Sequence, residues 1–212
     1  MIKATFKDWN LTSLDEAFGL KQKWECEIMQ NWQKEASKIT ISEAEKQILL
    51  DLQEPLTWGG KSWNEVELEN KFISPVIMTA KIDDRTIGYF LERTLSGTIG
   101  EYELSGNVDG MIATGFRDPH KPFFCMHEYK RSVENQGTPD GQVLAAMLVV
   151  QEKNGNDKPI YGMYIVGLTW NFMVLQGKEY CVSKDYKSDD EEVFAIFRML
   201  KALKQIILRD LL

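Results

Sequence analysis

The fold is decided by the stretch Phe123-Phe124-Cys125-Met126-His127-Glu128-Tyr129-Lys130-Arg131, an apolar run that ends in charged residues. Its aromatic and apolar residues predict a β-strand over 123–130. Side chains alternate between the two faces of a strand, so Glu128 and Lys130 point to the same face. Charges on so apolar a strand carry a desolvation cost unless they are paired or bind a metal ion.

Two further strands are predicted before this one, at 85–95 and 101–113. Asp109 lies on the second of them, in the sequence Gly-Asn-Val-Asp-Gly. The polar and proline-rich segment 117–122 is typical of a turn, and it returns the chain beside the second strand. Asp109 and Glu128 are therefore expected to meet across the strand pair or near a splayed strand end.

The remaining sequence alternates between helical and extended patterns. Helices are predicted at 14–37, 39–52, 63–78 and 140–152 and from 188 onward; strands are predicted at 160–168, 171–175 and 179–182. Ser42 and Glu45 form a capping box at the start of the second helix, and Thr138-Pro139 opens the helix at 140. Residues 63–168 thus describe an α/β core with a mixed sheet. Residues 1–58 are predicted to be a helical N-terminal extension of the main domain, 59–212.

Composition limits the classes of function. The 212 residues carry a net charge of −7, which disfavours non-specific nucleic-acid binding unless basic residues gather on one face. No apolar run reaches the roughly 18 residues of a membrane span, and no secretory signal is evident. Cys26, Cys125 and Cys181 are scattered, which predicts reduced thiols in a cytoplasmic protein.

The residue types Asp, Glu and Lys suit phosphodiester hydrolysis. Two carboxylates can hold a hard cation such as Mg²⁺, which polarises a phosphoryl oxygen and activates a bound water. Lys130 can orient that water or stabilise the transition-state charge. Two plainer interpretations stay open: Asp109 as a turn residue before Gly110, and Glu128 with Lys130 as a solvent-facing pair on an edge strand.

The order Asp, then Glu-x-Lys across a hairpin, then a helix resembles the PD-(D/E)XK nuclease superfamily. This resemblance implies a restriction-endonuclease-like αβββαβ core with a mixed central sheet, here between residues 63 and 168. One departure is Val108, which stands where the motif's name has proline.

Two other positions fit the same resemblance. The segment 64–75 is similar to the first core helix of the nuclease domain in type I restriction subunits, where a glutamate helps to organise the metal. Glu65 is the counterpart by this match, with Glu69 as the rival one turn later. Gln142 matches the glutamine that opens the corresponding helix in some of these nucleases.

The resemblance implies a metal-dependent nuclease acting on DNA, in a cytoplasmic protein without a membrane partner. The implied catalytic residues are Asp109, Glu128, Lys130, Glu65 and Gln142, and Asp109, Glu128 and Glu65 would hold Mg²⁺ or Mn²⁺. An RNA-directed nuclease and a catalytically silent binding module remain alternatives, as do a homodimer and a protein partner on the N-terminal helices. Arg131 is a candidate phosphate contact, and His120 and His127 are interpreted as structural. Gly59-Gly60-Lys61-Ser62 resembles a Walker A end but follows a helix, so we reject it.

Overall fold

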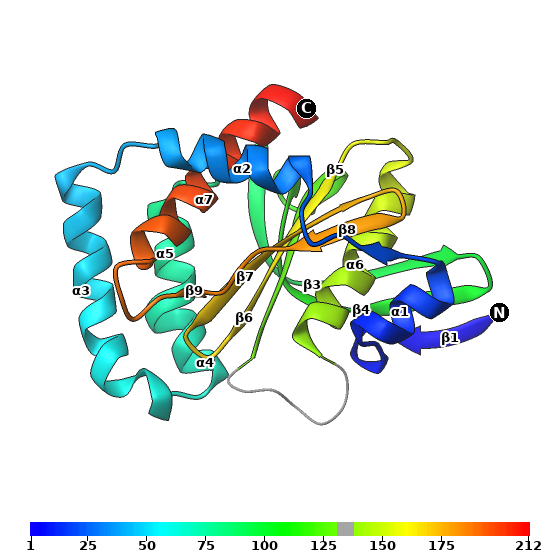
Figure 1. The fold of residues 1–212 in the computed structure, drawn as a ribbon, viewed down its shortest axis with the longest axis horizontal. Helices are drawn as coiled ribbons and strands as arrows, with labels where there is room; N and C mark the ends of the chain where they lie inside the picture. Colours follow the sequence, from blue (N-terminus) through cyan, green and yellow to red (C-terminus); the bar gives the residue numbers. More distant parts are fainter. Residues whose placement is uncertain (131–137) are drawn as a thin grey trace.

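One mixed β-sheet of nine strands runs through the part of the chain that the structure describes (Figure 1). The structure is a computed structural model, which describes residues 1–130 and 138–212, with only the backbone of Cys125 and Met126. The strand order is β1-β4-β5-β6-β7-β8-β2, with β3 paired to β4 and β9 to β7. The strands are β1 Ile2–Thr5, β2 Lys21–Gln22, β3 Ile87–Ile99, β4 Tyr102–Thr114, β5 His120–Lys130, β6 Ile160–Val166, β7 Thr169–Gln176, β8 Glu179–Val182 and β9 Tyr186–Lys187.

Helices cover both faces of the sheet (Figure 1). The main ones are α1 Leu11–Phe18, α2 Glu27–Lys38, α3 Glu43–Gly59, α4 Glu65–Leu68, α5 Ser74–Thr79, α6 Pro139–Asn154 and α7 Val193–Ile206. Short helical segments are η1 Phe6–Asp8, η2 Gly60–Ser62, η3 Glu69–Ile73 and η4 Ile207–Leu211. Helices α1 and α6 cover one face, and α2, α3, α5 and α7 share a second apolar core on the other.

The predicted element order from 63 to 168 is confirmed: helix, three strands, helix, strand. Strands β3, β4 and β5 are antiparallel neighbours, whereas β5 and β6 are parallel and α6 makes the connection between them. Thr138 caps α6 by accepting a hydrogen bond from the Gly141 amide, as its sequence predicted. The α/β class with a mixed central sheet is therefore correct.

The N-terminal 58 residues differ from the helical extension predicted for them. The helix expected at 14–37 is wrong, because Gly19 adopts a left-handed conformation (φ 64°) that ends α1 before β2 and α2 begin. Strand β1 pairs in parallel with β4, and β2 pairs in parallel with β8. The segment thus contributes strands at two places in the sheet as well as helices.

The helix predicted at 39–52 is present and longer, as α3. The Ser42 side chain accepts a hydrogen bond from the Glu45 amide at 3.3 Å, and Glu45 accepts one from the Ser42 amide at 2.8 Å. The capping box is thus confirmed. Glu45 also pairs with Lys201 of α7 at 2.6 Å, so the cap anchors α3 to the C-terminal helix.

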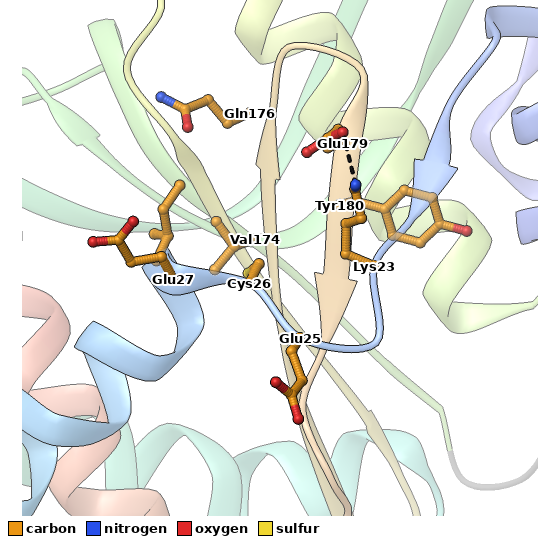
Figure 2. A pocket seen from close by; sticks show the side chains of 9 residues that line it. Lys23, Glu25, Cys26, Glu27, Val174, Gln176, Glu179 and Tyr180 are labelled. Atoms are coloured by element: carbon orange, nitrogen blue, oxygen red, sulfur yellow. Dashed lines mark ion pairs between the residues drawn. The ribbon is translucent and has the colours of Figure 1, made fainter.

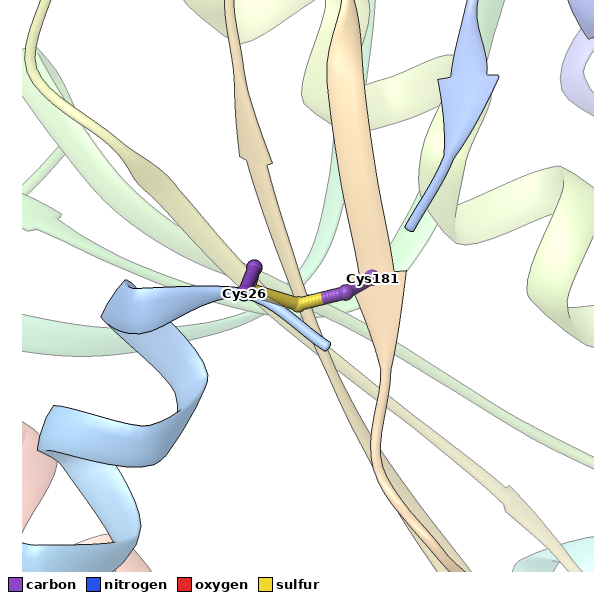
Figure 3. Close-up of a disulfide and its surroundings, with 2 residues drawn as sticks. All are labelled: Cys26 and Cys181. Carbon is purple, nitrogen blue, oxygen red and sulfur yellow. A yellow bond between two sulfur atoms is a disulfide. The ribbon is translucent and has the colours of Figure 1, made fainter. Parts of the chain in front are cut away.

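The prediction of reduced cysteines is wrong for two of the three, since Cys26 and Cys181 form a disulfide (Figure 3). They are 155 residues apart in sequence, but β2 lies beside β8 and leaves their Cα atoms 6.3 Å apart. That separation is ordinary for a disulfide. Spacing along the chain could not reveal the pair, because strand pairing creates it.

None of the helices in the described residues has the length and apolar character that a membrane span needs.

Candidate functional site

Strands β4 and β5 separate at Asp109. We call this place, with the side chains of Asp109, Glu128 and Lys130, the fork. The strand β1 pairs with Tyr102–Ser105 and β5 pairs from Gly110 onward, so residues 106–109 of β4 lie between the two partners. At this fork a carboxylate oxygen of Asp109 accepts a hydrogen bond from the Tyr129 amide at 2.8 Å. Of the two arrangements expected, this register fits the splayed strand end, and Asp109 lies within a strand rather than in a turn.

Glu128 and Lys130 share one face of β5, as alternation predicted. Lys130 Nζ lies 3.0 Å from Glu128 Oε1, and both residues are buried, with 7% and 4% of their surface exposed. Because β5 lies between β4 and β6, the alternative of a solvent-facing pair on an edge strand is wrong. Burying two charges is costly unless they are paired, and this pairing offsets part of the cost.

Glu65 reaches the same cluster from the first turn of α4. Its carboxylate lies 3.8 Å from Lys130 Nζ and remains partly exposed. Asn64 caps this helix by accepting a hydrogen bond from the Glu67 amide, which fixes where α4 begins and so where Glu65 points. Its rival Glu69 lies beside Tyr129 instead, where burial first and Glu69 second raise the pKa of the tyrosine.

Burial makes the two strand carboxylates hard to ionise. It raises the pKa of Asp109 to about 6, with Glu92 and Glu65 adding to the effect while the Tyr129 amide and Lys130 oppose it. The pKa of Glu128 rises to about 7, through burial and then through repulsion by Asp109. Burial alone would lower the pKa of Lys130, but Glu128, Asp109 and Glu65 together raise it. The cluster is therefore an acidic site that a bound cation would relieve.

Glu92 is a site residue that sequence reasoning missed. It lies across from Asp109, at the one position between Leu91 and Arg93 where the β3–β4 register has no partner. Its φ is 48°, a left-handed conformation that is unfavourable for a glutamate. An exposed glutamate within a strand gives no sequence signal of this kind, because the irregularity arises from the pairing of two strands.

His127 lies on the opposite face of β5 from Glu128, as predicted, and is fully buried. Its ring stacks on Tyr89 and Tyr129, with ring centroids 5.2 and 6.0 Å away. It also fills the space above Gly110, where a Cβ atom would lie 1.6 Å from Nε2. Burial lowers its pKa to about 3, so the ring is neutral and acts as packing beneath the fork.

Gln142 is the fourth residue of α6 and is buried, with 5% of its surface exposed. Among residues 1–130 and 138–212, no hydrogen bond or ion pair joins its side chain to Asp109, Glu128 or Lys130. Arg131 lies outside the described residues. The structure thus brings together four of the five predicted residues and leaves the fifth on the adjoining helix.

No three histidine, cysteine or acidic side chains within the described part of the chain are grouped closely enough to hold a metal ion by themselves. A scan against models of protein families finds no match to this chain, and a search of curated proteins also finds none.

A separate surface pocket of about 320 Å³ lies near the disulfide (Figure 2). Lys23 and Glu179 pair across its rim at 3.1 Å, and Tyr180 contributes to its wall. The pocket adjoins β8, which β6 and β7 separate from β5, so it is distinct from the carboxylate fork.

Proposed function

We propose that the protein is a metal-dependent nuclease of PD-(D/E)XK type that hydrolyses phosphodiester bonds in DNA. The observation that carries the proposal is the fork itself: Asp109 at the separation of β4 and β5, beside a buried Glu128–Lys130 pair. The helix-strand order around the fork supports a restriction-endonuclease-like core. The resemblance noted in the sequence rests on these same residues.

The side chains at the fork fit Mg²⁺. Asp109 and Glu128 offer hard oxygen ligands, and both carry raised pKa values that a divalent cation would reverse. Mg²⁺ keeps several water ligands and needs only one or two carboxylates, so the lack of a three-ligand group among the described residues is compatible with it. Glu65 would complete the set from α4. When bound, the metal would polarise the phosphoryl oxygen and acidify a water.

Lys130 would serve as a charge donor and not as a metal ligand. Its ammonium stays protonated because three carboxylates raise its pKa. Held at 3.0 Å by Glu128, it would donate hydrogen bonds to a phosphate oxygen and stabilise the charge that develops there. Gln142 would supply an amide donor from α6.

A catalytically silent binding module is the second candidate. The observation that favours it is the Glu128–Lys130 ion pair, which already satisfies one of the two strand carboxylates. A protein net charge of −7 also weakens the attraction for a polyanion. This module would keep the fold and bind neither Mg²⁺ nor Mn²⁺ at the fork.

Titration calorimetry with Mg²⁺ and Mn²⁺, together with cleavage assays on single- and double-stranded DNA and RNA, tests the proposal. We expect binding at one site and metal-dependent cleavage, with both lost in Asp109→Asn. Metal binding that Asp109→Asn leaves unchanged would refute the site. Cleavage of RNA but not of DNA would support the alternative of an RNA-directed nuclease.

A further inference from the structure

An exposed tryptophan stands at the end of α3. Trp58 has 78% of its surface exposed, although tryptophan is usually well buried. Val66, one residue after Glu65, is also 65% exposed. Tryptophan is among the residues enriched where proteins bind their partners, because its large flat ring gives much contact area for few rotatable bonds.

The segment that carries Trp58 adjoins the candidate site. A Cβ atom added at Gly60 would lie 3.2 Å from the side chain of Leu168, so the two residues are packed together. The preceding residue, Gly167, donates its amide hydrogen to the Lys130 carbonyl at 2.8 Å. From the other end of the segment, Glu65 pairs with Lys130 at 3.8 Å. In Figure 1, α4 likewise lies beside the β6–β7 hairpin.

Lys61 lies on the same side of this segment as Trp58. The backbone stays helical from α3 into η2, with φ and ψ of −114° and −24° at Gly59 and −56° and −35° at Gly60. Side chains three residues apart on such a backbone are neighbours. Lys61 is exposed, and none of the ion pairs in the described part of the chain includes it. The Trp58 ring and the Lys61 ammonium group are thus exposed to solvent next to each other.

We propose that Trp58 and Lys61 bind an unpaired nucleotide of single-stranded DNA beside the phosphate held at the fork. The indole ring stacks on the base and the ammonium group pairs with a backbone phosphate. An unpaired base has a free face for the ring, whereas neighbours cover both faces of a base in a duplex. This inference rests on the proposed nuclease function and assigns it a substrate form.

The test measures binding without cleavage. Fluorescence anisotropy of a labelled thymidine oligonucleotide in EDTA reports affinity for the wild type, Trp58→Ala, Lys61→Gln and the control Trp24→Ala. Trp24 is 92% exposed and lies outside this segment. We expect about a tenfold loss of affinity for Trp58→Ala, as for other base-stacking residues. Lys61→Gln should lower affinity and its salt dependence, and Trp24→Ala should match the wild type.

Several results would overturn the inference. Unchanged affinity in Trp58→Ala would do so, as would an equal loss in Trp24→Ala. Tighter binding of a duplex or of RNA, with the same loss in Trp58→Ala, would reject the unpaired DNA nucleotide as the ligand. Calorimetry with Mn²⁺ separates this from the proposed function: a fork that binds no metal while Trp58→Ala still weakens DNA binding would refute the nuclease alone. Lost metal binding in Trp58→Ala would make its role structural.

Discussion

Asp109→Asn is expected to make the metal-free protein more stable while removing its function. The substitution keeps an oxygen that can accept the Tyr129 amide hydrogen bond, now 2.8 Å long, and removes only the charge. Folding raises the pKa of Asp109 from 3.8 to about 6. One pKa unit is worth about 1.4 kcal/mol, so ionisation of Asp109 lowers the free energy of unfolding by about 3 kcal/mol. Since Asp109 is partly exposed, water screens some of this, and we expect a gain of 1–3 kcal/mol.

The sign of the pH dependence follows from linkage. Between pH 3.8 and about 6 the folded state binds more protons at Asp109 than the unfolded state does, so stability falls as pH rises through that window. The gain in free energy of unfolding from Asp109→Asn should therefore be small below pH 3.8 and should reach its full size above pH 6. Urea denaturation at both ends of the window measures it.

A matched control is Glu103→Gln on the same strand. Glu103 pairs with Lys3 at 3.8 Å near the surface, and its loss should change stability by less than about 0.5 kcal/mol. Mg²⁺ should raise the melting temperature of the wild type and of Glu103→Gln, but not of Asp109→Asn. An Asp109→Asn protein that is less stable than the wild type above pH 6 would refute the reasoning, because the carboxylate would then be stabilising the fork.

Lys130→Met should lower the cleavage rate by about 10²- to 10³-fold while calorimetry finds Mn²⁺ affinity nearly unchanged; equal loss of both would make Lys130 structural. Glu65→Gln should slow cleavage strongly with little change in melting temperature, and Glu69→Gln serves as its control; the reverse ranking would move the assignment one turn along the helix. Glu45→Gln should cost about 1–2 kcal/mol at neutral pH, because its pKa is lowered to about 2, mainly by Lys201. That cost should disappear as pH falls from 4.5 toward 2, and a urea-denaturation difference that persists at low pH would contradict the assignment.

Features that depend on neighbours in sequence were predictable. The capping box of Ser42 and Glu45 and the cap at Thr138 need only a few adjacent residues, and both are confirmed. The shared face of Glu128 and Lys130 follows from strand alternation alone. For the same reason the arrangement of helices and strands between residues 63 and 168 could be predicted from local patterns.

Features that depend on distant pairing were not predictable. Strands β1 and β2 are four and two residues long, too short to show a period, and they form only because β4 and β8 offer them an edge. The disulfide at Cys26 depends on the second of these pairings. Glu92 belongs to the site through an irregularity between two strands that the sequence of neither one specifies.

The placement of β1 bears on how this chain can be handled. Residues Ile2–Thr5 occupy the edge of β4 that would otherwise present the amides and carbonyls of Tyr102–Ser105 to solvent. A bare strand edge readily recruits another chain. Removing the first five residues would thus leave an unpaired edge of β4 only a few positions from Asp109. Aggregation of the truncated protein through that edge would then be mistaken for loss of activity.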